Sequence, residues 1–370
     1  MKAHCHRPDL AEAFHVVSGV VPSRTPKEIL RNVKLILDGG TATLVGTDQE
    51  IGIRREIAGV ETDSSGEVLL PTSRVLSILR ELSGESVDLE ITEKSVWIRS
   101  GQSEFELASE DPDEFPEVAT FQGDAYYTLS AAAFREGIRR TVFASDVEST
   151  RYALGGVLVE PAAEELTLAA TDSRRLAVAK VACAAEGIEE PPSSGSIVPA
   201  KAMHLIDRSI GDDDETVQLV LGANELQVRC GSSTITSRLV EGRFPPYANV
   251  IPQDSGTKFQ LVVAPFYAAV RQAQIVTTDD SRGVDFTFTK GGLTLSSVAA
   301  DVGHSKVELP VSYDGDELSI MFDPRFVADF LRVLEQEANV TLRLTDGESA
   351  AVFEVDGSYT YVIMPLSRDH

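Results

Sequence analysis

Few residues of this chain have the types and spacings that catalysis or metal binding requires. His4 and His6 flank Cys5 and could ligate zinc, but a cluster of this kind is more typical of surface sequence. The acidic run Asp212–Glu215 could hold a divalent cation, although it lacks EF-hand spacing and is typical of a solvated turn. The sequence contains no phosphate-binding loop, no dinucleotide-binding glycine motif and no nucleophile elbow. It therefore predicts no catalytic residue, no metal and no cofactor, and it favours a binding or scaffold protein.

The composition is that of an ordinary globular protein of more than one domain. The chain has 370 residues, of which 42% are hydrophobic and 25% are charged. Apolar runs are too short to span a bilayer, the first ten residues lack a secretory h-region, and the three cysteines form no C-x-x-C pair. We therefore expect a cytoplasmic protein with free thiols. The net charge of −25 argues against tight, contact-driven binding of nucleic acid, but not against a protein that holds DNA by its shape.

The chain repeats one unit three times. A short β-like run, a proline and an amphipathic helix recur around Pro71, Pro199 and Pro324, which are 128 and 125 residues apart. The stretch Glu114–Pro116 recurs as Arg243–Pro245, 129 residues later. Coincidence between common strand–turn–helix patterns is the alternative, but landmarks that agree on one period favour similar domains of ordinary size. The sequence predicts domains at residues 1–120, 125–248 and 256–370.

Each repeat is predicted to be α+β, with antiparallel strands and two helices. Alternating apolar and polar residues, as in Asp285–Thr289, indicate half-buried strands, and glycine-containing turns separate them. Proline is tolerated at the start of a helix, where its missing N–H costs nothing. The predicted helices are Asp9–Ser18, Thr72–Leu82, Ser130–Phe143, Pro199–Ile210, Ala264–Val276 and Asp323–Leu334.

The basic residues are concentrated on these helices. The charged residues of the six helices sum to +3 in a chain of −25, and the acidic residues gather in loops such as Glu110–Glu114. Each arginine could simply solvate its own helix, but the recurrence across helices favours one mildly basic surface. On charge alone this surface includes Arg80, Arg139 and Arg140.

Four motifs carry a resemblance to a known family. Thr150–Glu160, Ala169–Val178, Glu241–Tyr247 and Tyr361–Leu366 resemble, in order and spacing, the bacterial replicative sliding clamp, the DNA polymerase III beta subunit family. The resemblance implies three tandem domains of like topology that close as a head-to-tail dimeric ring, with antiparallel sheets outside and helices lining the hole. It implies a non-catalytic processivity factor that encircles double-stranded DNA and takes short peptide motifs of DNA polymerase, clamp-loader subunits and repair proteins.

The resemblance also assigns candidate site residues. The DNA-facing candidates by position are Arg24, Arg151, Tyr152 and Lys201. The partner-peptide pocket between the second and third domains would be formed by Leu154, Thr171, Arg174, Arg175, Leu176, Pro245, Val250, Val362, Ile363, Met364, Pro365 and Leu366. The dimer interface would bring Arg74, Ile78, Leu82 and Phe105 of one protomer against Ile275 and Val276 of the other.

The chain departs from the family pattern near the predicted pocket and DNA loop. The family commonly has Gly-His in place of Ser173-Arg174, Arg in place of Asn249 and Tyr in place of Ala153, and it usually ends before Ser367–His370. These changes leave room for a specialised second clamp. Two rival interpretations are a monomeric peptide-binding adaptor of the same fold and an enzyme on a repeated α+β scaffold with a metal in its acidic loops.

Overall fold

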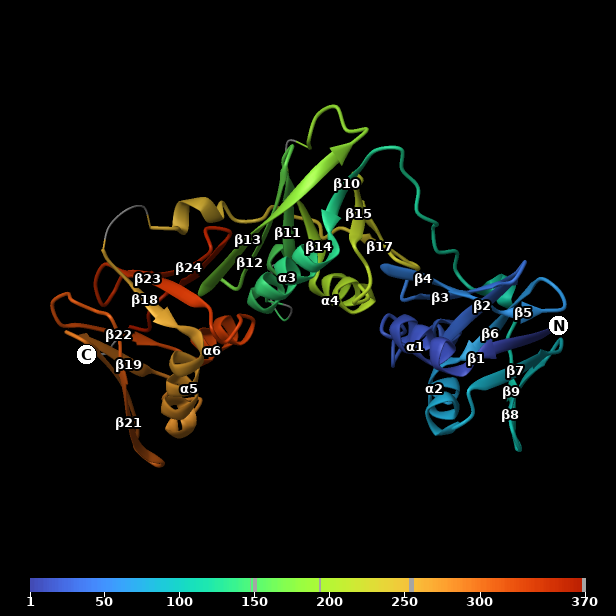
Figure 1. The fold of residues 1–370 in the computed structure, drawn as a ribbon, viewed down its shortest axis with the longest axis horizontal. Helices are drawn as coiled ribbons and strands as arrows, with labels where there is room; N and C mark the ends of the chain where they lie inside the picture. Colours follow the sequence, from blue (N-terminus) through green and yellow to red (C-terminus); the bar gives the residue numbers. More distant parts are fainter. Residues whose placement is uncertain (147, 149–151, 193, 253–255, 368–370) are drawn as a thin grey trace. The chain divides into compact units, whose positions relative to one another are not determined.

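The computed structural model describes residues 1–146, 148, 152–192, 194–252 and 256–367 (Figure 1). The chain forms two compact units. The first comprises residues 1–135, 183–191 and 201–239, and the second comprises residues 136–182, 192–200 and 240–370. The second repeat of the sequence therefore contributes strands and helices to both units.

The first repeat has two antiparallel sheets and two helices, α1 (Arg7–Ser18) and α2 (Thr72–Glu81). One sheet has the order β5-β1-β7-β8-β9, with strands Glu61–Thr62, Lys2–His6, Ser86–Ile91, Ser95–Ser100 and Ser103–Ala108. The other has the order β4-β3-β2-β6, with strands Ile51–Ala58, Thr41–Thr47, Asn32–Asp38 and Gly66–Pro71. Both helices bury one apolar stripe, which in α1 includes Leu10, Phe14 and Val17, as expected for amphipathic helices that cover a sheet.

The first unit also contains four strands of the second repeat. These are β10 (Tyr126–Ser130), β15 (Thr216–Leu221), β16 (Glu225–Cys230) and β17 (Ser233–Arg238). β17 pairs with β4, with Ile235 opposite Ile53, so one continuous sheet joins the first repeat to the second. Helix α4 (Ala200–Ser209) contributes residues 201–209 to this unit.

The second unit contains the remaining strands of the second repeat and the whole third repeat. Its larger sheet contains β11 (Gly156–Pro161), β12 (Glu165–Thr171), β14 (Ser196–Pro199), β18 (Thr257–Val262), β23 (Asn339–Leu344), β24 (Ala351–Val355), β25 (Tyr359–Ile363) and most of β13 (Arg175–Glu186). Its smaller sheet has the order β21-β20-β19-β22, with strands Gly303–Pro310, Gly292–Ala299, Val284–Thr289 and Leu318–Phe322. β13 pairs with β25 through residues 175–179, so the last strand of the chain lies beside the second repeat.

The predicted α+β class and its helices are confirmed. The described residues contain six α-helices, and the remaining four are α3 (Ala131–Thr141), α4, α5 (Val263–Ala273) and α6 (Pro324–Arg332). The predicted helices around α3 and α5 end instead in 3-10 turns, η3 (Val142–Ala144) and η6 (Gln274–Val276). α6 begins at Pro324, and the Asp323 carboxylate accepts a hydrogen bond from the Arg325 N–H, which fixes the start of that helix.

An aromatic cluster joins α6 to the strand that ends the chain. Phe330 of α6 stacks on Tyr361 of β25, with ring centroids 4.8 Å apart and planes 4° apart, and it also contacts Phe353 and Tyr359. All four side chains are fully buried. The cluster holds β25 rigidly, and the end of β25 forms part of the cavity described below.

Candidate functional site

An apolar cavity of about 290 Å³ lies in the second unit, where the β12–β13 turn, the end of β25 and the 3-10 turn η5 (Tyr247–Val250) meet. It is lined by Thr171, Ser173, Arg174, Arg175, Leu176, Pro245, Tyr247, Val250, Val362 and Met364. Val250 is 57% exposed and Met364 is 48% exposed, which is unusual for large apolar side chains. A hollow with apolar walls and a few polar groups at its edge suits a short, partly apolar peptide.

The β12–β13 turn that forms one edge of the cavity is held in a fixed shape. The Asp172 carboxylate accepts hydrogen bonds from the N–H groups of Arg174 and Arg175, each at 3.0 Å. Ser173, between Asp172 and Arg174, has φ of +74°, a left-handed conformation that few non-glycine residues adopt. The Met364 N–H donates to the Arg174 carbonyl at 2.9 Å, so the turn is also tied to the residue after β25.

Arg175 follows this turn, and its side chain is almost fully buried in hydrogen bonds and ring contacts within the fold. Its Nε donates to Asp172 at 2.9 Å and its Nη1 to Asp329 of α6 at 2.8 Å. The guanidinium lies between two rings, 4.6 Å from the centroid of Phe326 and 5.3 Å from that of Phe143. Burial opposes its charge, but the pKa of Arg175 is raised overall because Tyr361, Asp329 and Asp172 stabilise the cation. Arg175 therefore connects α6 to the turn at the cavity.

Eight of the twelve residues predicted for the peptide pocket line this cavity, and four do not. Val362 and Ile363 are neighbours on β25, and successive strand residues face opposite sides, so Val362 lines the cavity while Ile363 is fully buried in the core. Leu154 is also a core residue, at 4% exposure. Pro365 and Leu366 lie past the cavity, where the Leu366 N–H donates to the Met321 carbonyl of β22 at 2.8 Å.

Ser173 and Tyr247 line the cavity but were not among the predicted residues. Tyr247 donates a hydrogen bond from its hydroxyl to Glu160 at 2.8 Å, and burial together with this carboxylate raises its pKa. The signal for Tyr247 is present in the sequence, because it ends the motif Glu241–Tyr247 that carries part of the family resemblance. Ser173 could have been found from its position between two predicted residues in a tight turn.

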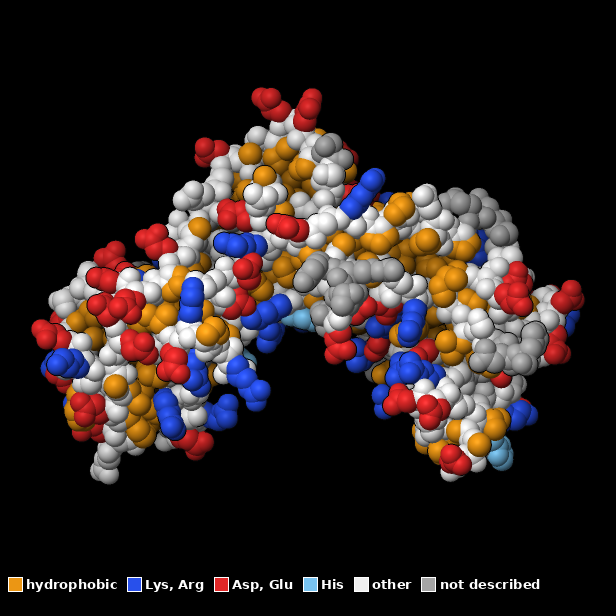
Figure 2. Space-filling view, turned by 180° about the vertical axis from the view of Figure 1, so that it is seen from behind, with side chains coloured by type: hydrophobic (Ala, Val, Ile, Leu, Met, Phe, Trp, Pro, Cys, Tyr) orange, Lys and Arg blue, Asp and Glu red, His pale blue; other side chains and the backbone are white. Residues whose placement is uncertain are grey.

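The predicted DNA-contacting residues differ in how far their charge is available. Arg24 and Arg80 are exposed, and Arg139 is exposed but already has an interaction partner within the chain. Lys201 is also exposed, but its ammonium lies 2.5 Å from Asp48 and 3.2 Å from the Val20 carbonyl. Arg151 and the Tyr152 side chain lie outside the described residues. On the face of the first repeat drawn at the left of Figure 2, Lys and Arg side chains gather mainly on the side of the helices.

The Arg140 side chain is mostly buried and makes its contacts within the fold. Its side chain is 13% exposed, forms an ion pair with Glu136 on the same helix and lies over the ring of Tyr359 at 5.2 Å from the centroid. Arg140 was predicted from the charges on its own helix. The sequence could not show its contact with Tyr359, which lies more than two hundred residues further along the chain. This contact removes Arg140 from the residues best placed to meet a phosphate.

The predicted dimer-interface residues come from α2 and β9 of the first repeat and from η6 beside β21 of the third. β9 pairs only with β8 among the described residues and is exposed along most of its length, including Phe105. β21 is the edge strand of the third-repeat sheet, and Ile275 in the neighbouring turn η6 is 75% exposed. Arg74 is exposed and Val276 is half-buried. Ile78 and Leu82 are only 8% exposed, because the apolar stripe of α2 already packs on its own repeat.

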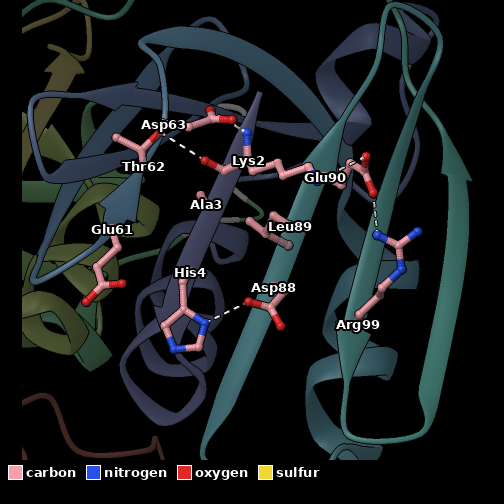
Figure 3. A pocket seen from close by; sticks show the side chains of 10 residues that line it. All are labelled: Lys2, Ala3, His4, Glu61, Thr62, Asp63, Asp88, Leu89, Glu90 and Arg99. Carbon is pink, nitrogen blue, oxygen red and sulfur yellow. Dashed lines mark hydrogen bonds and ion pairs between the residues drawn. The ribbon is translucent and has the colours of Figure 1, made fainter.

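A polar groove of about 520 Å³ crosses the five-stranded sheet of the first repeat (Figure 3). Five of its charged or titratable side chains are paired with one another: His4 with Asp88, and both Lys2 and Arg99 with Glu90. His4 and His6 point to one face of β1 and Cys5 points to the buried opposite face. Strand alternation thus separates the three residues of the possible zinc cluster. The described residues contain no group of three or more His, Cys, Asp or Glu side chains arranged to hold a metal ion.

The His4–Asp88 pair is expected to make the stability of the fold depend on pH. The hydrogen bond that the protonated His4 ring donates to Asp88 raises the folded-state pKa of His4 above its usual 6.5, so the pair stabilises the fold fully below that value. The contribution is lost as the pH rises through the folded-state pKa. We expect His4→Gln to lower the melting temperature by about 1 to 2 °C at about pH 5.5 and by almost nothing at about pH 9.

Fluorescence of Trp97 reports this transition, because Trp97 lies on β8 of the same sheet. The matched variant Asp88→Asn removes the charge and should lose the same pH dependence. An equal effect of His4→Gln at both pH values would contradict the assignment.

The fold and the cavity together define the class of this protein. Three strand-rich repeats carry two helices each, and an apolar cavity is lined by residues of the second repeat, of η5 and of the end of β25. No helix among the described residues is both long and apolar enough to cross a membrane. Tandem strand-rich repeats and a cavity with exposed apolar walls are typical of a protein that binds other macromolecules.

Comparison with known proteins identifies the family. Residues 1–119, 128–246 and 248–367 match the N-terminal, central and C-terminal domains of the DNA polymerase III beta subunit. The chain is 30% identical to the beta sliding clamp of Escherichia coli K12, with 99% of this chain and 100% of the relative covered. It is also 30% identical to the beta sliding clamp of Pseudomonas putida KT2440, with 97% and 98% covered. The chain belongs to the DNA polymerase III beta subunit family.

Solved structures agree with this assignment. The DNA polymerase sliding clamp of Bacillus subtilis is similar over the full length of both chains, with a TM-score of 0.91 and 25% identity. The clamp of Pseudomonas aeruginosa bound to griselimycin is similar over the same extent, with a TM-score of 0.90 and 28% identity.

Proposed function

We propose that this protein is a DNA sliding clamp, a ring-shaped homodimer that encircles duplex DNA and tethers a DNA polymerase to it. The observation that carries the proposal is the match of all three repeats, in order and along almost the whole chain, to beta sliding clamps. The proposed domains span residues 1–120, 125–248 and 256–370. The clamp itself performs no catalysis, and it works in the cytoplasm.

Ring closure is supported by the edges of the two terminal sheets. β9 belongs to the first repeat and β21 to the third, and each has one side without a strand partner among the described residues. An unpaired strand edge is a template for pairing with another chain. Pairing β9 of one protomer with β21 of the next would be head-to-tail, and two such contacts close a dimer. Phe105 and Ile275, both exposed, would then be covered.

The proposed grip on DNA is topological. A chain of net charge −25 is poorly suited to bind phosphates tightly over its whole surface. A ring needs only scattered cations, such as the exposed Arg24 and Arg80, to keep the duplex centred while it slides. Lys201 lies next to Asp48 and would contribute a weaker field.

The cavity is the proposed site for partner proteins. DNA polymerase, clamp-loader subunits and repair proteins would each insert a short apolar segment against Leu176, Val362 and Met364. The exposed Val250 and Met364 would be covered on binding, which provides the hydrophobic driving force. A specialised second clamp is the alternative within the same family, and it is favoured by the unusual Ser173-Arg174 pair at the cavity.

The oligomeric state tests ring closure. We expect a mass of about twice the 39.9 kDa of one chain by light scattering. Ile275→Asp should weaken the dimer at least tenfold, because it buries a charge without a partner. Val262→Asp is the matched control, since Val262 is an exposed valine of the third repeat on β18, a strand that is not part of the proposed β9–β21 pair. A monomeric wild-type protein would refute the ring and favour a monomeric adaptor.

A further inference from the structure

We propose that the cavity selects peptides carrying a carboxylate next to the apolar segment, and that Arg174 is the residue that selects them. The inference rests on the proposed function and adds a specificity to it. It starts from the two cations that line the cavity, Arg174 and Arg175.

The two arginines differ in exposure and in whether their charge is already paired. The side chain of Arg175 is 10% exposed and its charge is balanced by Asp172 and Asp329. Arg174 is exposed, and within the part of the chain that the structure describes no carboxylate pairs with its guanidinium. The Arg174 charge is therefore available to a ligand, whereas the Arg175 charge is not.

The backbone of Arg174 is fixed although its side chain is exposed. Its N–H donates to Asp172 and its carbonyl accepts from Met364, so the residue is anchored on both sides of its Cα. The left-handed Ser173 before it sets the direction of the turn. An anchored arginine at the edge of an apolar cavity loses less conformational freedom on binding than a mobile one, and its planar group suits a carboxylate.

The remaining charges around the cavity do not compete for the same ligand group. The opposite wall, Tyr247–Val250, contains no charged side chain. Glu160 lies behind that wall and accepts the hydrogen bond of Tyr247. The cavity edge thus presents one available positive charge on a chain of net charge −25. Apart from Arg174, the long-range field of the protein repels an acidic peptide.

Paired peptides test the proposal. Each labelled peptide of about ten residues carries two adjacent leucines, with Glu or Gln placed one to three positions before or after them. Fluorescence anisotropy measures binding to the full-length protein. For at least one placement we expect the Glu peptide to bind about two- to fivefold more tightly than its Gln partner, the size of an exposed ion pair. In Arg174→Gln this order should reverse, because only the repulsive field remains.

The controls separate this inference from the proposed function. Arg243→Gln removes an exposed arginine of the same unit that does not line the cavity, and it should keep the preference for Glu. If Gln and Glu peptides bind equally to the wild-type protein, or if the preference survives in Arg174→Gln, the inference is refuted while peptide binding stands. If no peptide of the panel binds, the inference fails together with the peptide-binding role of the cavity.

Discussion

Arg175→Met is expected to destabilise the second unit by about 3 kcal/mol. The substitution keeps the long apolar stem between Phe143 and Phe326 but leaves the carboxylates of Asp172 and Asp329 without their cation. Removing one partner of a buried ion pair costs about 3–5 kcal/mol, and the partial exposure of Asp329 favours the lower end of that range. Chemical unfolding followed by far-UV circular dichroism measures the loss.

Two features of the chain provide controls for this experiment. Trp97 is the only tryptophan and lies in the first unit, so its fluorescence should report a smaller shift than circular dichroism does. The triple variant Arg175→Met, Asp172→Asn, Asp329→Asn removes the unpaired charges, and the amide oxygen introduced by Asp172→Asn can still accept the hydrogen bonds of the turn. This variant should recover part of the lost stability. No recovery would mean that the contacts of the guanidinium with the aromatic rings of Phe143 and Phe326, rather than its ion pairs, dominate the contribution of Arg175 to stability.

Met364→Asp should weaken partner binding at least thirtyfold while leaving the fold intact. Met364 is 48% exposed in the cavity wall, so an aspartate there is tolerated in the unbound protein. On peptide binding the carboxylate would lose its water beside Leu176 and Val362, which costs about 2 kcal/mol or more and weakens binding at least thirtyfold. Surface plasmon resonance with the DNA polymerase from the same source measures the change.

Val262→Asp is again the matched control. Val262 is 45% exposed in the same unit but lies on β18, away from the cavity. It should bind the polymerase as the wild type does, and both variants should keep the wild-type melting temperature. Equal affinities of Met364→Asp and Val262→Asp would show that the polymerase binds elsewhere.

The helices and the repeat could be predicted from the sequence because their signals are local. Pro324 after Asp323 marks a helix start within a few residues, and the three prolines that repeat at a regular spacing indicate equivalent positions. Helix ends were less certain: α3 and α5 each continue into a 3-10 turn, which leaves little trace in apolar spacing.

The site could be predicted only in part, because it depends on contacts between distant segments. The motif at the end of β25 indicated both Val362 and Ile363, but only pairing with β13 decides which of them faces the cavity. The charge of Arg140 was visible in the sequence, whereas its contact with Tyr359 was not. Ile78 and Leu82 were predicted at an interface, yet packing within the first repeat leaves each of them only 8% exposed.

Retention on DNA tests the central claim most directly. The protein is loaded by a clamp loader onto nicked circular DNA, half of the sample is linearised, and both halves are separated by gel filtration. A topological ring stays with the circles, leaves the linear molecules by sliding off their ends, and does so without a change of salt. Failure to co-elute with circles, under conditions in which a control clamp is loaded, would contradict the account. Equal retention on linear and circular DNA would also contradict it, because it would indicate binding by contact.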